Sequence, residues 1–439
     1  MAPDHPHLPH TATPTWRTVL FILLTTWGWA LLFQLFFSVD PCPPGDPSTF
    51  DWLARNLLDN GQLSEPDSGY RSWRAPGYTA FVAGIYAILG RNPVFVVIVQ
   101  YGLVGLSAVL LFITSYRLWA NRPLSYLFFA FFLLYIPTFY YAGILYAETL
   151  FLTVVSAAIW RAVPLLQHPH NQWSKALSTG ILVGLAILTR TALLYFPLFA
   201  LGIGLFIFLT ARLFRHPIHL PPHLYKKMTG LVIGMILIVA PWTVRNYAIH
   251  GQFLATGSYG GYNLYMAQYP LQTYTHWPGR IPAELWPEIT QNIDAVRHKH
   301  SEVEQDRILS QKAVEIIKKY PFRFIKKGAK EFIRFYTKAG AYGQGFIAYL
   351  SAIQYLGLVL LSVWGIYLSR HDVLGILLGT YIAYFGLIHA MTFAMGRLKE
   401  AIVPAILLLS ALGAYDLCCR IFKKWGFPSI VSQDKSAYS

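Results

Sequence analysis

The sequence predicts an all-α polytopic membrane protein with about ten transmembrane helices, and three observations lead to this fold class. Apolar stretches of about twenty residues recur along the 439-residue chain, and a helix of that length crosses a bilayer core. Charged residues make up only 13% of the chain, against about 25% in soluble domains. Hydrophobic residues make up 55%, and their runs are too numerous for one soluble core.

Ten segments are apolar and long enough for the predicted spans: 17–37, 93–116, 123–141, 147–165, 175–190, 192–214, 228–246, 347–369, 373–393 and 399–417. The run 76–90 is shorter, because Gly77 and Gly90 leave only a brief apolar stretch between them. Such a helix covers roughly 20 Å of a core about 30 Å thick. We therefore expect 76–90 to be an interfacial or re-entrant helix.

The distribution of basic residues predicts the topology of the chain. Leaving 76–90 out of the count places the short basic loops 117–122, 161–175 and 212–227 in the cytoplasm, as the positive-inside bias requires. The expected organisation is a disordered cytoplasmic tail (1–16), one transmembrane domain (17–417) and a basic cytoplasmic tail (418–439). Two long loops, 38–92 and 247–346, are then extracytoplasmic.

The formal net charge of +15 is typical of nucleic-acid-binding proteins, but its distribution indicates another partner. The basic residues stand at the ends of apolar runs, where they meet anionic lipid headgroups. We expect membrane lipids as partners and no nucleic acid.

The second long loop contains an amphipathic stretch. Gln311 to Lys338 alternates aromatic or aliphatic residues with lysines, which predicts a helix on the membrane surface, broken near Pro321. Simple anchoring to headgroups and help in holding a lipid-phosphate substrate are both consistent with it.

Ionisable side chains close to hydrocarbon are costly and mark functional sites. In the predicted topology one group of polar residues falls near the outer ends of the spans: Asp46, Asp51, Arg71, Arg74, Glu148, Arg190, Arg245, Asn246, His389, Arg397, Lys399 and Glu400. We expect the acids and arginines of this group to meet in one cleft on the extracytoplasmic side.

Each member of the group also has a purely structural interpretation. Asp46 and Glu148 stand where a helix N-terminus is expected, and each is a candidate helix cap. Arg190 and Arg245 are candidates for snorkelling residues at span ends. The convergence of many such residues on one face favours a site.

Five motifs, in order along the chain, carry a resemblance to a known family: GDPSTFDWLARNLLDNGQLS, YRSWRAPGYTAFVAGIYAILG, YAETLF, APWTVRNYAIHGQF with GGYNLYMAQ, and HAMTFAMGRLKEAIVPAILLLSALGAY. Together they resemble the bacterial polyprenyl-phosphate-sugar glycosyltransferases of the GT-C superfold. This group is related to protein mannosyltransferases and lipid A aminoarabinose transferases.

The resemblance implies an inverting glycosyltransferase. It would move a hexose or pentose from a polyprenyl (undecaprenyl- or dolichyl-type) monophosphate donor to an extracytoplasmic hydroxyl. Asp46 matches the catalytic base and Glu148 the second acid. At an apolar interface, we expect the pKa of Asp46 to be raised.

The donor phosphate needs cations, and we expect Arg74, Arg190 and Arg245 to bind it. Stacking on sugar faces is expected of Trp73, Tyr78 and Tyr262. The remaining candidates for substrate binding are Arg71, Asn246, His389 and Arg397. No metal or other cofactor is required, although a divalent cation on Asp46 and Glu148 is an alternative.

Two other functions are consistent with the composition of this chain: a transporter or flippase of lipid-linked sugars, and a non-catalytic membrane scaffold. The acceptor stays open among glycan, lipid and protein. The expected location is a bacterial inner membrane, crossed many times, with the active site on the extracytoplasmic side.

Overall fold

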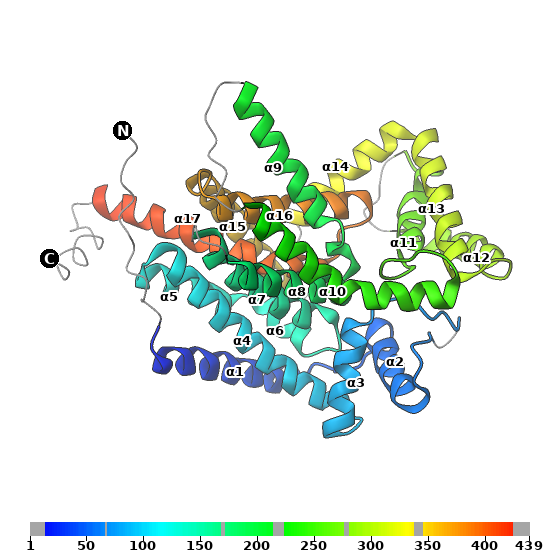
Figure 1. Cartoon of the computed structure of the whole chain (residues 1–439), viewed down its shortest axis with the longest axis horizontal. Coiled ribbons are helices and arrows are strands. Elements are labelled where there is room, and N and C mark those ends of the chain that lie inside the picture. The colour runs from blue at the N-terminus through cyan, green and yellow to red at the C-terminus, as the bar shows by residue number, and fades with distance from the viewer. Residues whose placement is uncertain are drawn as a thin grey trace.

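The computed structural model describes residues 14–65, 68–167, 172–213, 224–275, 281–337 and 346–424, and every regular element in these ranges is a helix. Figure 1 shows long helices running side by side as an elongated bundle. Within the described ranges, eight helices are long and apolar enough to cross a membrane, or up to nine if one bent pair is a single span. The predicted all-α polytopic membrane fold is confirmed.

The eight candidate spans contain α1 (Trp16–Phe37), α4 (Pro93–Trp119), α7 (Ala147–Gln167), η1 (Thr191–Leu193) with α9 (Phe196–Leu213), α10 (Leu224–His250), α15 (Phe346–Leu368), α16 (Val373–Met391), and η4 (Gly396–Ile402) with α17 (Val403–Lys424). Large apolar side chains stay exposed on their outer surfaces, for example Phe206, Leu237 and Leu360. Such surfaces are suited to lipid rather than to water.

Two of the ten predicted spans are not straight helices of full length. Segment 123–141 is divided into α5 (Arg122–Leu134) and α6 (Ile136–Ala142), which meet at 53°. Pro137 explains the break, because it has no N–H to donate to the carbonyl four residues earlier and its ring clashes with that carbonyl. Segment 175–190 forms α8 (Trp173–Thr189), whose 17 residues make it shorter than the spans.

Close helix pairing holds α8 against α10. A Cβ atom on Gly180 would lie 2.0 Å from the Leu231 carbonyl oxygen, and one on Gly234 would lie 2.1 Å from the Leu177 carbonyl oxygen. Only glycine permits backbones to approach so closely, as at many helix interfaces in membranes. The interface continues toward the C-terminal end of α8 at Gly184, where a Cβ would lie 2.8 Å from Ile238 Cβ, and Arg190 follows that end.

The two long loops are also helical. The first contains α2 (Asp46–Asn60) and α3 (Gly77–Leu89), and the second contains α11 (Gly260–Gln268), η2 (Tyr269–Leu271), η3 (Ala283–Leu285), α12 (Trp286–Arg297), α13 (Glu302–Lys319) and α14 (Pro321–Thr337). The second loop has its own apolar core around Ile289 and Leu309. In Figure 1, α2 and α11 to α13 gather at one end of the bundle, opposite the C-terminal end of α17.

Two finer predictions about the loops are confirmed. The run 76–90 is a short apolar helix of 13 residues, α3, although its position relative to a membrane stays a prediction. The amphipathic stretch is divided at Pro321, where α13 ends and α14 begins. Phe322, Ile325 and Ile333 on α14 are exposed, as lipid contact would require.

The predicted tails are described only in part. Residues 1–13 of the N-terminal tail lie outside the described ranges, and α1 begins at Trp16. In the predicted tail 418–439, α17 continues to Lys424, and 425–439 lie outside the described ranges.

Candidate active site

Acids and arginines from five separate parts of the chain alternate in one continuous series, which we call the ion chain. In spatial order its members are Glu65, Arg74, Asp46, Arg397, Glu148 and Arg190. Five of these six, all but Glu65, were expected to converge as acids and arginines at the outer ends of the spans.

Each guanidinium in the series contacts at least one carboxylate. Arg74 places Nε 3.0 Å from Glu65 and an Nη atom 2.9 Å from Asp46. Arg397 forms an ion pair with the other oxygen of Asp46, and its Nε lies 3.8 Å from Glu148. Arg190 completes the series with an Nη atom 3.0 Å from the same Glu148 oxygen.

Asp46 is positioned by the start of α2. Gly45 precedes it with φ at +113°, a conformation that L side chains rarely adopt, and the Gly45 carbonyl accepts hydrogen bonds from Ser48 and Thr49. The cap residue is thus Gly45, and Asp46 is the first residue of the helix. Since its carboxylate binds two arginines, the interpretation of Asp46 as a helix cap is wrong.

Glu148, Arg190 and Arg397 come from the ends of three span-like helices. Glu148 is the second residue of α7, Arg190 follows α8 with extended backbone, and Arg397 lies in η4. Gly77 brings α3 onto the end of α8, because a Cβ there would lie 2.7 Å from the Leu188 carbonyl oxygen. The ion chain therefore lies at the helix ends that the predicted topology placed together.

The three carboxylates of the ion chain differ in exposure, and Glu65, at 12%, is intermediate. The side chain of Asp46 is 23% exposed, whereas that of Glu148 is 5% exposed. Asp46 is consequently the carboxylate of the ion chain that an incoming molecule reaches most readily, and Glu148 lies behind Arg397.

The pKa of Asp46 differs from the sequence-based expectation. Burial alone would raise it, but the attraction of Arg74 and Arg397 outweighs burial and holds the pKa below its ordinary value. The expected upward shift is wrong for the unliganded chain, because sequence could not show that two guanidinium groups bind this one carboxylate.

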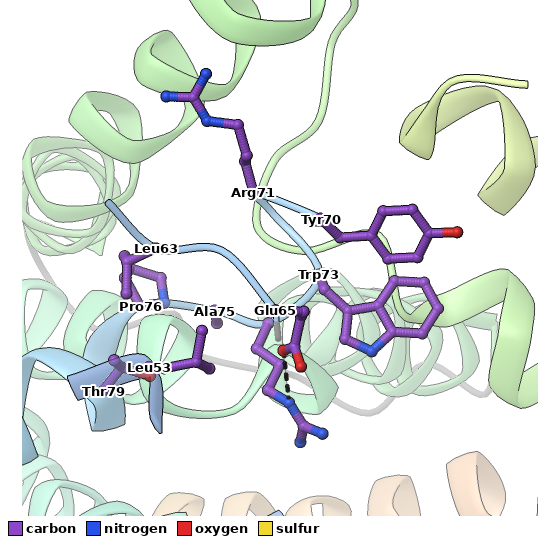
Figure 2. A pocket seen from close by; sticks show the side chains of 10 residues that line it. Leu53, Leu63, Glu65, Tyr70, Arg71, Trp73, Ala75, Pro76 and Thr79 are labelled. Carbon is purple, nitrogen blue, oxygen red and sulfur yellow. Dashed lines mark hydrogen bonds and ion pairs between the residues drawn. The ribbon is translucent and has the colours of Figure 1, made fainter. Parts of the chain in front are cut away.

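Glu65 was missed by the sequence analysis. Burial raises its pKa despite the pairing with Arg74. It lines a pocket together with Tyr70, Trp73 and Arg74. Figure 2 shows Glu65 directed at the guanidinium with which it pairs, while Arg71 projects away from it. Nothing in the spacing of Glu65 and Arg74 signalled this pair.

An aromatic group adjoins the pocket. The Trp73 ring centroid lies 5.0 Å from that of Tyr70, 4.9 Å from Tyr259 and 5.4 Å from Tyr262. Arg74 lies over the ring of Tyr259, at 5.6 Å. Trp73 and Tyr262, both expected to stack on sugars, are thus together, and Tyr259 joins them although the sequence analysis did not single it out.

Two residues predicted to contact the substrate are buried, and their contact with substrate stays a prediction. Tyr78 has no exposed surface, its hydroxyl donates to Gln100 at 2.8 Å, and its ring packs edge-on against Phe50. His389 is 5% exposed, and its ring stacks on Phe335 at 4.9 Å. Both belong to the packed core in this structure, because the apolar faces of α3 and α16 carry them inward.

Arg245 and Asn246 lie in a second polar cluster, which we call the Ser72 node. Arg245 donates to the Arg71 carbonyl at 2.8 Å and to the Ser72 hydroxyl at 2.7 Å. Asn246 is fully buried and donates to the carbonyls of Leu254 and Thr256. The side chain of Asn246 is enclosed and Arg245 is engaged with the protein itself, so neither belongs to the ion chain. That both bind substrate stays a prediction.

The described residues contain no group of three or more His, Cys, Asp or Glu that could hold a metal ion. A cation shared by Asp46 and Glu148 would have to lie between the two carboxylates. The Arg397 guanidinium, which contacts both, already supplies positive charge there. This pair of acids does not fit a metal site.

No protein-family model matches the chain, and no curated protein matches it. Among solved structures, the chain is similar to ArnT from Cupriavidus metallidurans bound to undecaprenyl phosphate, at 14% identity and a TM-score of 0.41. The apo state of ArnT gives 13% identity and 0.39; each comparison covers 93% of this chain and 79% of the other. A likeness this weak leaves the function to be inferred from the chain's own residues.

Proposed function

We propose that the chain is an inverting glycosyltransferase that moves a sugar from a polyprenyl monophosphate to an acceptor hydroxyl on the extracytoplasmic side of a bacterial inner membrane. The observation that carries this proposal is the binding of Asp46 by both Arg74 and Arg397 at the exposed part of the ion chain. The motif resemblance described above supplies the reaction class.

In the proposed reaction Asp46 is the general base. It takes the proton of the acceptor hydroxyl as that oxygen forms a bond to the anomeric carbon from the face opposite the phosphate. The bond between this carbon and the phosphate oxygen breaks, and its electron pair leaves with the polyprenyl phosphate. General-base catalysis of this kind contributes about 10²- to 10⁴-fold in rate.

The leaving phosphate gains negative charge as the bond breaks, so cations must already be in place. Arg74 and Arg397 are the accessible guanidinium groups, with 19% and 22% of their side chains exposed. Guanidinium binds phosphate through paired hydrogen bonds. Glu148 and Arg190 lie deeper and orient Arg397 from behind.

Donor binding and base activation are linked in this arrangement. The ion chain contains three carboxylates and three guanidinium groups, so it is neutral when all are ionised. A phosphate must therefore take Arg74 or Arg397 away from Asp46. Burial then dominates, and the pKa of Asp46 rises toward the working pH.

Trp73, Tyr259 and Tyr262 are the proposed contacts of the sugar, since aromatic rings offer apolar faces beside the phosphate-binding arginines. The prenyl chain would lie against the exposed apolar surfaces of the spans, and no metal ion is required. The identity of the sugar and of the acceptor is left to experiment.

The test uses purified protein in proteoliposomes with labelled polyprenyl-phosphate sugars and a panel of glycan, lipid and peptide acceptors. We expect a new glycosidic product with inverted anomeric configuration from the wild type, little from Asp46→Asn, and near-normal amounts from Asp51→Asn. Asp51 is a suitable control because it lies on the same helix and pairs with Arg55. Label that crosses the bilayer with no product formed would overturn the proposal in favour of a flippase.

A further inference from the structure

Neither arginine that binds Asp46 lies on an α-helix, since Arg74 is in a connecting loop and Arg397 is in a short 3-10 helix. Arg74 follows the turn that joins α2 to α3, and Arg397 lies in η4 beyond the end of α16. Such segments are held less firmly by their own hydrogen bonds and need support from packed elements. The source of that support is the second long loop.

Glu302, the first residue of α13, supports the segment that bears Arg74. Its carboxylate is 8% exposed and accepts the backbone N–H groups of Arg71 at 2.8 Å and Ser72 at 3.0 Å. The hydroxyl of Ser258 donates to the same carboxylate at 2.6 Å. These bonds end two residues before Arg74, and hydrogen bonds to a carboxylate are among the strongest in proteins.

Glu331, on α14, supports the segment that bears Arg397 in a parallel way. Its carboxylate is fully buried and accepts the backbone N–H of Ala394 at 2.6 Å, three residues before Arg397. The neighbouring Met391 carbonyl accepts hydrogen bonds from Lys327 of α14 and from Gln268 of α11. The turn between α16 and η4 is therefore held by two helices of the second loop.

Glu302 and Glu331 make the same kind of contact. A buried carboxylate is costly to keep, and here each of two such groups binds main-chain atoms next to one of the two guanidinium groups on Asp46. Both carboxylates belong to α13 and α14, which are consecutive helices separated only by Tyr320. The second loop thus contacts both sides of the Asp46 site.

We propose that Glu302 and Glu331 are positioning residues, which act through Arg74 and Arg397 respectively to set the arrangement of cations around Asp46. This assignment rests on the proposed function, because it concerns the same site. Small displacements of catalytic groups cost about 10- to 100-fold in rate, so each carboxylate should matter to transfer without touching the substrate.

Double-mutant cycles test the proposal. We expect Glu302→Ala to lower kcat/KM for transfer about 10-fold or more in the wild type, but less than about 2-fold in an Arg74→Ala background, because the group through which it acts is gone. Glu331→Ala and Arg397→Ala should behave in the same way. The matched control is Glu304→Ala, because Glu304 lies on α13 and pairs with surface residues; it should change transfer less than about 2-fold.

A purely structural role predicts a different result. Glu302→Ala and Glu331→Ala would then lower kcat/KM by the same factor whether or not the arginine is present. Such additivity would overturn the proposal. Glu302→Gln and Glu331→Gln provide the same cycle if the alanine variants fail to fold, since glutamine keeps one acceptor oxygen.

The same cycles measured on affinity for a polyprenyl phosphate separate this proposal from the proposed function. Coupling in binding, with no transfer by the wild type, would overturn the glycosyltransferase assignment and support the positioning roles. If the wild type transfers sugar but the glutamate and arginine substitutions have additive effects on both kcat/KM and donor affinity, only the positioning roles would be overturned.

Discussion

The ion chain and the Ser72 node are both polar clusters built at the same end of the bundle, yet their chemistry differs. In the ion chain, carboxylates and guanidinium groups contact one another through side chains, and Asp46 is partly exposed. In the Ser72 node, Arg245 and Asn246 are hydrogen-bonded largely to backbone carbonyls and to Ser72. Polar residues near span ends thus form two kinds of cluster, and their partners distinguish the proposed reactive cluster from the other.

The largest expected effect separates the arginines of the two clusters. Arg74→Met and Arg397→Met should each lower sugar transfer by about 10²-fold or more, because preorganised charge at a developing anion is lost. Arg245→Met should lower it far less. Initial rates with saturating acceptor check this, and Arg55→Met serves as a control on α2. If Arg245→Met lowered the transfer rate as much as Arg397→Met does, both clusters would have to belong to one active site.

The pH dependence of transfer tests whether the ion chain contains the general base, which the Ser72 node is not expected to supply. The unliganded pKa of Asp46 lies below its ordinary value of 3.8, and a base must be deprotonated to act. The acid limb of kcat/KM, which reports the free enzyme, should therefore lie below about pH 4, and that of kcat, which reports the donor complex, at higher pH. Rates measured from pH 3.5 to 8 check this. Coincident limbs would argue against displacement of the arginines by the donor.

A stability measurement addresses the Ser72 node. Asn246→Leu removes the donor to the Leu254 carbonyl, one of two donors to the Thr256 carbonyl, and the acceptor of the buried Ser72 hydroxyl, which should cost about 1–3 kcal/mol in free energy of unfolding. Thermal unfolding in detergent checks this, with the exposed Asn60→Ala as a control. Transfer per folded molecule should change only a few-fold, and a selective loss of transfer at unchanged stability would assign Asn246 to the active site.

The smallest expected effect is that of metal removal. Since Arg397 supplies the positive charge between Asp46 and Glu148, EDTA treatment should leave the transfer rate of purified protein unchanged. Loss of activity on EDTA treatment, with recovery on adding Mg²⁺ or Mn²⁺, would show that the chain needs a cation from solution.

Much of this architecture follows from the sequence, because apolar length and loop charge are local properties. Each of the ten predicted spans is largely helical where the structure describes it, although eight, or up to nine, helices are long and apolar enough to cross a membrane. Asp46, Arg74, Glu148, Arg190 and Arg397 meet, as their places near the outer ends of the spans predict. The bend at Tyr135 was missed, although Pro137 offered a signal for it.

Other features depend on tertiary contacts that no local pattern encodes. Glu65 reaches Arg74 through an irregular turn, and the depressed pKa of Asp46 results from two guanidinium groups that lie 28 and 351 residues away in sequence. Tyr78 and Arg245 stand beside functional motifs but point to other partners. Position near a motif indicates that a residue is close to a site, whereas its hydrogen-bond partners decide whether it takes part.

The most direct measurement is a single-turnover experiment in which labelled donor is first bound to wild-type protein or to Asp46→Asn, and acceptor is then added. If Asp46 is the base, the variant should bind donor at least as well as the wild type, because its arginines are released, and should form the glycosidic bond about 10²- to 10⁴-fold more slowly. Bond formation at the wild-type rate by Asp46→Asn would contradict the central claim.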